Sequence, residues 1–322
     1  MELLKKLTGV FGPSGCEAKV SELIKEEVKA YADEIYTDAL GNLICRKKGS
    51  GKKIMFASHM DEIGIVVTFI DEKGFLRFAD VGGLYLRNLI NRRVRFENGT
   101  IGVIGTEENN EKRQMSKMFI DIGAKDREDA EKMVSIGDMA VFEGELICQN
   151  GKIISKALDN RVGCYVLIEA LKRVKSENDL YFCFTTQEEV GLRGARTAAF
   201  KIEPEYALSV DVTDIGDTPK APKMAVKLGN GAAVKVMDYS VITSHEVREK
   251  LISVAENRGI KYQREIMMEG GTDAGVIHFT KGGVKTGGIS IPTRYIHSPS
   301  EMIDEEDLKA SIDLLAGFAE EI

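Results

Sequence analysis

Hydrophobic residues recur along this chain in two different patterns, and the pattern changes twice. In residues 1–65 and again from residue 152, short apolar runs alternate with longer stretches whose apolar residues recur at helical spacing. Between them, apolar and polar residues alternate one by one between Gly and Asn turns. The first pattern predicts strands separated by helices, and the second predicts antiparallel β-structure.

The flanking regions predict an α/β domain. The predicted strands span 52–58, 179–186, 206–212 and 285–291, and the predicted helices span 19–32, 159–175, 244–259 and 304–321. Strands separated by helices pair in parallel and are covered on both faces. We therefore predict a mixed, mostly parallel sheet flanked by helices, formed by residues 1–65 and 152–322 together. A capping box from Ser14 to Glu17 is expected to begin the first of these helices.

The middle region predicts a small β domain inserted into the first one. Residues 66–151 alternate between apolar and polar side chains in the manner of a barrel or sandwich, with one helical stretch at 125–134. From the pattern alone, this insert is a β module that could merely shield a site.

Composition narrows the class of partner. The 322 residues are 43% hydrophobic and 30% charged, which is ordinary for a soluble globular protein. A net charge of −7 argues against a nucleic-acid partner, because phosphate binding needs clustered Lys and Arg. No apolar run is long enough to span a membrane. The five cysteines form no C-x-x-C pair, which favours a reduced, cytoplasmic protein.

Side chains of the types that bind metals stand near the ends of these predicted strands. They are His59, Asp159, Glu189, Asp211 and His297. Because the carboxyl ends of parallel strands meet at one edge of a sheet, we expect these side chains to converge there. Two imidazoles and three carboxylates can hold two divalent ions if one carboxylate bridges them, and such a pair activates water for hydrolysis. Oxygen and nitrogen ligands without thiolate suit Zn²⁺, Co²⁺ or Mn²⁺.

Each candidate ligand also has an ordinary structural interpretation. Asp159 opens a predicted helix, where Asp is a preferred cap, and Asp211 could accept hydrogen bonds in a turn. Their coincidence with two of the chain's four histidines at one predicted sheet edge favours metal binding. The other two, His245 and His278, fall in predicted helices and are not expected to be ligands.

Two neighbouring carboxylates complete the predicted chemistry. Asp61 lies two residues after His59, where it can accept the second imidazole N–H and orient the ring. Glu188 precedes Glu189, and in extended backbone the two point to opposite sides. Glu189 can therefore bind metal while Glu188 serves as general base.

A glycine-rich segment is a candidate for substrate binding. Gly271, Thr272 and Asp273 stand at the start of a predicted helix, where Thr272 or Asp273 could equally be a helix cap. The sequence leaves the preferred substrate residue open.

These segments resemble a known family. GPSGCE, DALGN, SHMDEIG, FIDIGAKDREDAE, KALDNR, QEEVGLRGA, VDVTD, GGTDAG and IHSPSEM match, in order and over nearly the whole chain, the tetrahedral aminopeptidases, whose relatives are labelled glutamyl aminopeptidase or endoglucanase M. The resemblance implies two metal ions per subunit, Glu188 as general base, Asp61 as the partner of His59, and a cis peptide between Asp159 and Asn160. It implies that one ion is bound by His59, Asp159 and Asp211, and the other by Asp159, Glu189 and His297.

The resemblance also implies an assembly and a substrate. The insert would drive dimerisation, and the dimers would form a hollow tetrahedral dodecamer that cleaves peptides from their N-termini. Three alternatives remain: a glycoside hydrolase, a metal-dependent deacylase and a non-catalytic assembly protein. The absence of tryptophan and the presence of the two histidines disfavour the glycosidase, and the intact Glu188 with its ligand set disfavours the assembly protein.

Overall fold

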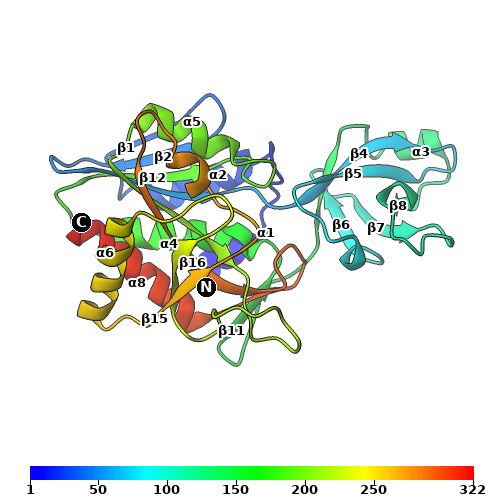
Figure 1. Cartoon of the computed structure of the whole chain (residues 1–322). Helices are drawn as coiled ribbons and strands as arrows, with labels where there is room; N and C mark the ends of the chain where they lie inside the picture. The colour runs from blue at the N-terminus through cyan, green and yellow to red at the C-terminus, as the bar shows by residue number, and fades with distance from the viewer.

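A computed structural model describes all 322 residues (Figure 1). The α-helices are α1 (Glu2–Gly9), α2 (Ala18–Val28), α3 (Arg127–Glu131), α4 (Leu158–Arg173), α5 (Arg193–Ile202), α6 (His245–Arg258), α7 (Ala274–Ile277) and α8 (Glu305–Glu321). The strands of the large sheet are β1 (Glu34–Thr37), β2 (Leu43–Lys47), β3 (Lys53–His59), β10 (Ile147–Gln149), β11 (Lys152–Ser155), β12 (Asp179–Thr185), β13 (Tyr206–Thr213), β14 (Ala232–Met237), β15 (Tyr262–Ile266), β16 (Lys285–Arg294) and β17 (Glu301–Asp304).

The large sheet is parallel at its centre and antiparallel toward its edges. Its order is β1-β2-β12-β3-β13-β16-β17-β11-β10, with β14 and β15 branching from β16. Parallel pairing joins β12, β3, β13 and β16 in turn and also joins β14 to β15. The predicted α/β fold with a mixed sheet is therefore confirmed, and the parallel part is the central group of strands.

Helices cover both faces of the sheet because the central strands are apolar on both sides. In β3, Ile54 and Phe56 face the core beneath α1, α2, α4, α6 and α8, whereas Met55 and Ala57 face the smaller core beneath α5 and α7. The period-two alternation of a strand sends neighbours to opposite faces, so one apolar run supplies both cores.

The middle of the chain closes into a barrel. Its strands are β4 (Gly64–Ile70), β5 (Leu76–Val81), β6 (Arg93–Phe96), β7 (Ile101–Thr106), β8 (Met118–Asp121) and β9 (Met139–Phe142), in the order β4-β5-β8-β7-β6-β9. A separate core fills it, and in Figure 1 it projects to the right of the layered part. The division at residues 66–151 stays a prediction. The barrel strands lie within residues 64–142, and the following β10 pairs in the large sheet.

The predicted capping box is wrong. The first predicted helix exists as α2, but Glu17 stands before it with helical dihedral angles and no side-chain cap. Ser14 instead donates its hydroxyl to Asp61 at 2.6 Å. The local pattern is that of a cap, yet a distant buried carboxylate takes the hydroxyl.

None of the helices combines the length and the apolar character needed to cross a membrane.

Candidate metal centre

The carboxyl ends of the central parallel strands bring the predicted ligands together. His59 is the last residue of β3, and Asp211 lies near the end of β13. Glu189 follows β12, and His297 lies in the turn between β16 and β17. Asp159 arrives from the start of α4, which packs against β13 and β3. Residues far apart in sequence thus meet at one sheet edge.

His59 faces three carboxylates. Its Nε2 atom lies 3.2 Å from Asp159 Oδ1, 3.7 Å from Asp211 Oδ1 and 3.9 Å from Glu188 Oε2. The imidazole is 2% exposed. One imidazole nitrogen and several carboxylate oxygens therefore surround a small buried volume.

His297 faces two carboxylates on the other side of Asp159. Its Nε2 atom lies 3.4 Å from Asp159 Oδ2 and 3.2 Å from Glu189 Oε2. The two oxygens of Asp159 thus point to different histidines, which is the arrangement that a bridging carboxylate needs between two cations.

The interpretation of Asp159 as a helix cap is wrong. The residue lies inside α4 with non-helical dihedral angles, no side chain caps this helix, and its carboxylate faces the two imidazoles. The implied cis peptide between Asp159 and Asn160 is present. The backbone N–H of Asp159 donates to Glu301 Oε2 at 2.9 Å.

Asp61 connects His59 to the segment that carries the two glutamates. Its carboxylate is fully buried, with Oδ1 3.4 Å from His59 Nδ1. Oδ1 accepts the backbone N–H of Glu188 at 3.1 Å, and Oδ2 accepts that of Glu189 at 3.2 Å and the Ser14 hydroxyl. Asp61 therefore orients more than the histidine that the sequence assigned to it.

The segment before α2 supports the same glutamates. Glu17 is 6% exposed, and its Oε1 accepts the backbone N–H groups of Gly15 and Gln187. Sequence reasoning placed Ser14 and Glu17 in a helix cap, although both lie in the GPSGCE motif. That motif could have indicated that both residues support the site.

The charge of the cluster fits divalent cations. Glu189 Oε1 is buried without any hydrogen-bond partner, so one carboxylate oxygen lacks a positive neighbour. Burial opposes charge on His297, but the carboxylates of Glu189 and Asp159 outweigh it and raise the pKa of His297 to about 12. Without a cation, this excess of carboxylates is balanced only by protonated imidazoles. Two imidazoles and three carboxylates form the donor set of a two-metal centre, so these residues fit such a pair.

Glu188 has the environment of a proton carrier. Burial raises the pKa of its carboxyl well above the ordinary range, and the charges of Asp211 and Glu189 add to this effect. Its side chain is 12% exposed, so it borders the open side of the cluster. A raised pKa makes the carboxylate a better proton acceptor, which suits general acid–base work.

The barrel also reaches the cluster. Gly82 and Gly83 follow β5 and lie against Glu189 and His297. A Cβ on Gly83 would lie 3.0 Å from His297 Nδ1, so a residue other than glycine would require the imidazole to shift. The Tyr85 ring, half exposed, lies beside His297 with its centroid 6.3 Å from that of the imidazole. The sequence did not lead us to predict this contact. The Gly-Gly pair at the end of a strand could have indicated it.

The candidate substrate loop is mostly buried. Thr272 and Asp273 are each 1% exposed, so their side chains present no surface to a ligand. Thr272 donates to Asp238, and Asp273 accepts the Thr185 hydroxyl at 2.6 Å. The interpretation of either side chain as a helix cap is also wrong, since α7 has none. A substrate role for this loop stays a prediction, and Gly271 is its more accessible residue.

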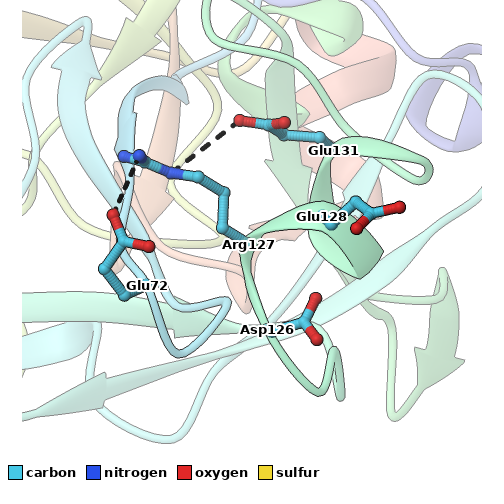
Figure 2. A pocket seen from close by; sticks show the side chains of 5 residues that line it. All are labelled: Glu72, Asp126, Arg127, Glu128 and Glu131. Carbon is cyan, nitrogen blue, oxygen red and sulfur yellow. Dashed lines mark ion pairs between the residues drawn. The ribbon is translucent and has the colours of Figure 1, made fainter.

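The other two histidines lie elsewhere. His245 begins α6 with its side chain 80% exposed, and His278 follows α7 and donates to the Ala274 carbonyl at 3.0 Å. A surface hollow of about 280 Å³ lies on the barrel, between the β4–β5 turn and α3 (Figure 2). There Arg127 pairs with Glu72 at 2.9 Å, so this acidic hollow contains its own cation.

Comparisons with known proteins show the family of this chain. The family model of M42 glutamyl aminopeptidase matches residues 41–314. The chain belongs to this family. The resemblance noted in the sequence is thereby confirmed, and the chain is a peptide hydrolase.

Relatives match the M42 chain over its whole length. A protein of Acetivibrio thermocellus whose name places it among the aminopeptidases is 54% identical over 98% of this chain and 96% of its own. The lysyl aminopeptidase of Pyrococcus furiosus is 34% identical over 100% of this chain and 97% of its own.

Solved structures share the fold closely. An aminopeptidase from Desulfurococcus kamchatkensis has a TM-score of 0.96 at 41% identity, covering 100% of this chain and 94% of that one. The TET1 peptidase of Pyrococcus horikoshii, described as able to assemble into a tetrahedron or a large octahedral shell, has a TM-score of 0.92 at 37% identity, covering 100% and 99%.

Proposed function

We propose that this M42 protein is a two-metal aminopeptidase that removes N-terminal residues from peptides. The observation that carries the proposal is that the two oxygens of Asp159 face two different histidines, at 3.2 Å from His59 and 3.4 Å from His297. We assign one ion to His59, Asp159 and Asp211, and the other to Asp159, Glu189 and His297. The donor atoms suit Zn²⁺ or Co²⁺, with Mn²⁺ as a third candidate.

Bound divalent ions would polarise the scissile carbonyl and make water easier to deprotonate. Glu188 then takes the proton of the attacking water at its carboxylate. The raised pKa of Glu188 keeps that proton available, and the residue passes it to the leaving amine. Asp61 holds the backbone of Glu188 through a hydrogen bond to its N–H, which keeps the base at the site.

We also propose that the M42 chain self-associates through the barrel and forms a homododecamer. The barrel strand β7 carries two apolar side chains that are exposed in the single chain, Ile101 at 44% and Val103 at 41%. Exposed apolar groups of this kind favour burial in an interface. The assembly described for the Pyrococcus horikoshii relative supports a closed shell.

We propose a reducing, cytoplasmic location. All five cysteines are free, and three of them are buried. Burial raises the pKa of both Cys45 and Cys164 to about 12, so their thiols stay protonated and unreactive.

Substitution of Glu188 by Gln tests the function directly. Removing a general base lowers kcat by about 100-fold to 10,000-fold. Turnover of an aminoacyl p-nitroanilide should fall to this extent, while elemental analysis still finds two ions per subunit. Glu22→Gln, an exposed carboxylate on α2, is the matched control and should leave both values unchanged.

The same assays separate the alternatives. An aminopeptidase loses cleavage when the substrate's amino group is acetylated, whereas a deacylase acts on the blocked compound. A glycoside hydrolase would release sugar from soluble glucan in the presence of a chelator. Full activity of Glu188→Gln, or cleavage of the blocked substrate alone, would overturn the proposal.

A further inference from the structure

Glu301 is a buried carboxylate that the proposed mechanism does not use. It begins β17, is 1% exposed, and pairs in register with Ser155 of β11. Strand β17 is bonded to β16 on its other side. Because both neighbours fix the strand, the Cα position of Glu301 is set by the sheet.

Each oxygen of Glu301 accepts one backbone N–H from a different candidate ligand. Oε1 accepts from His297 at 3.0 Å, and Oε2 accepts from Asp159 at 2.9 Å. These two residues come from opposite ends of the second half of the chain. Their side chains face each other, with His297 Nε2 3.4 Å from Asp159 Oδ2. One carboxylate therefore connects the main chains of the two residues whose side chains must meet.

Neither backbone position belongs to a regular element that would hold it. His297 has a positive φ of 58°, a conformation that a residue with a Cβ rarely adopts unless its surroundings impose it. Asp159 has non-helical dihedral angles within α4. The N–H groups at both positions donate to Glu301, and these two hydrogen bonds connect both positions to the same side chain.

We propose that Glu301 is a positioning residue that sets the separation of Asp159 and His297, and thereby builds one of the two metal positions. This inference rests on the proposed two-metal function. It concerns the position bounded by Asp159, Glu189 and His297. The position on the other side shares Asp159, but its other two ligands, His59 and Asp211, lie on β3 and β13.

Metal titration of the metal-free protein tests this role without relying on activity. Glu301→Gln keeps the shape of the side chain but turns one acceptor oxygen into a donor facing a backbone N–H. We expect the affinity for one ion to fall by about 10–100-fold, the range for removing a group that orients a ligand. The other ion should lose less affinity, because strands hold two of its three ligands, so micromolar Co²⁺ would give one ion per subunit instead of two.

Two further variants separate positioning from folding. Asp304→Asn, on the same strand, weakens the cap of α8 and the ion pair with Lys152 at 2.7 Å. It should lower the melting temperature and leave two ions bound. Glu301→Asp keeps the charge on a shorter side chain and should retain part of the lost affinity, which also covers the case in which Glu301→Gln does not fold.

The outcomes are distinct. Two ions bound by Glu301→Gln with wild-type affinity would overturn the inference, as would an equal loss at both positions that follows the melting temperature as in Asp304→Asn. If the wild-type protein itself fails to bind two ions or to cleave peptides, the proposed function fails instead.

Discussion

Loss of the single charge of Asp61 should change both the activity and the stability of the protein. In Asp61→Asn one carboxylate oxygen becomes an amide nitrogen with two protons. If the nitrogen replaces Oδ2, the Ser14 hydroxyl can rotate and accept from it, but the Glu189 N–H faces a donor. If the nitrogen replaces Oδ1, the Glu188 N–H loses its acceptor and His59 Nδ1 keeps only the Asp61 backbone carbonyl, at 3.1 Å. The first orientation is therefore preferred.

The preferred orientation sets the expected magnitude. One hydrogen bond to a charged acceptor is lost in a site that is fully buried, so the free energy of unfolding should fall by about 1.5–3 kcal/mol. His59 also loses the charge that orients its ring. Removing such a partner costs about 10–100-fold in kcat/KM, equivalent to about 1.4–2.7 kcal/mol of transition-state stabilisation.

The assay pairs kinetics with denaturation. Hydrolysis of an aminoacyl p-nitroanilide gives kcat/KM, and urea unfolding of the metal-free protein gives the free energy change. Asp71→Asn is the matched control, because Asp71 Oδ1 also accepts two backbone N–H groups, in the distant β4–β5 turn. Unchanged kcat/KM in Asp61→Asn, together with a normal control, would refute the idea that this carboxylate organises the site.

Three further predictions concern the barrel contact, the protons and the ions. Gly83→Ala should lower kcat/KM by about tenfold to 100-fold by displacing His297, whereas Gly282→Ala, with open space around it, should not; equal activities would show that the close approach is dispensable. In the metal-free protein the raised pKa of His297, about 12 against an ordinary 6.5, contributes stability that is fully present below pH 6.5 and is lost as pH rises toward 12. The urea midpoint of the metal-free protein should therefore fall between pH 7 and pH 9, and a rising midpoint would contradict this sign. Because metals bind neutral imidazole, ion binding at pH 7 should release protons, which calorimetry in buffers of different ionisation enthalpy measures. Chelation should abolish activity and lower the melting temperature, and Zn²⁺ or Co²⁺ at about 100 times its Kd should restore about 2.7 kcal/mol of stability for each ion bound. Retained activity after complete removal of the ions would contradict metal dependence.

The order of strands and helices could be predicted from the sequence, because the periodicity of each element depends on residues that are close together in the chain. The apolar run at 52–58 and the helical spacing at 159–175 predict β3 and α4, since strand and helix periods differ. The alternating region between them became a closed barrel for the same reason. The ligand types were visible too, because four of the five stand beside the end of a predicted strand and Asp159 opens a predicted helix.

Predictions from local sequence patterns were wrong where a side chain interacts with a residue far away in the sequence. Ser14 has the spacing of a cap, but the buried Asp61 carboxylate accepts its hydroxyl. Asp159 has the position of a cap, but two imidazoles face its oxygens. Thr272 and Asp273 were candidates for substrate binding because they lie in a glycine-rich segment, and packing buries both side chains.

By itself, the sequence determined which residues could form strands and helices, the chemical types of the candidate ligands and the family to which the chain belongs. Only the tertiary structure decided that Asp159 lies between the two histidines, that Glu301 joins the backbones of Asp159 and His297, and that the barrel contributes Gly83. Periodicity is a property of residues a few positions apart. The distance between atoms of residues far apart depends instead on strand register and on single backbone conformations, such as the positive φ of His297, which no local pattern specifies.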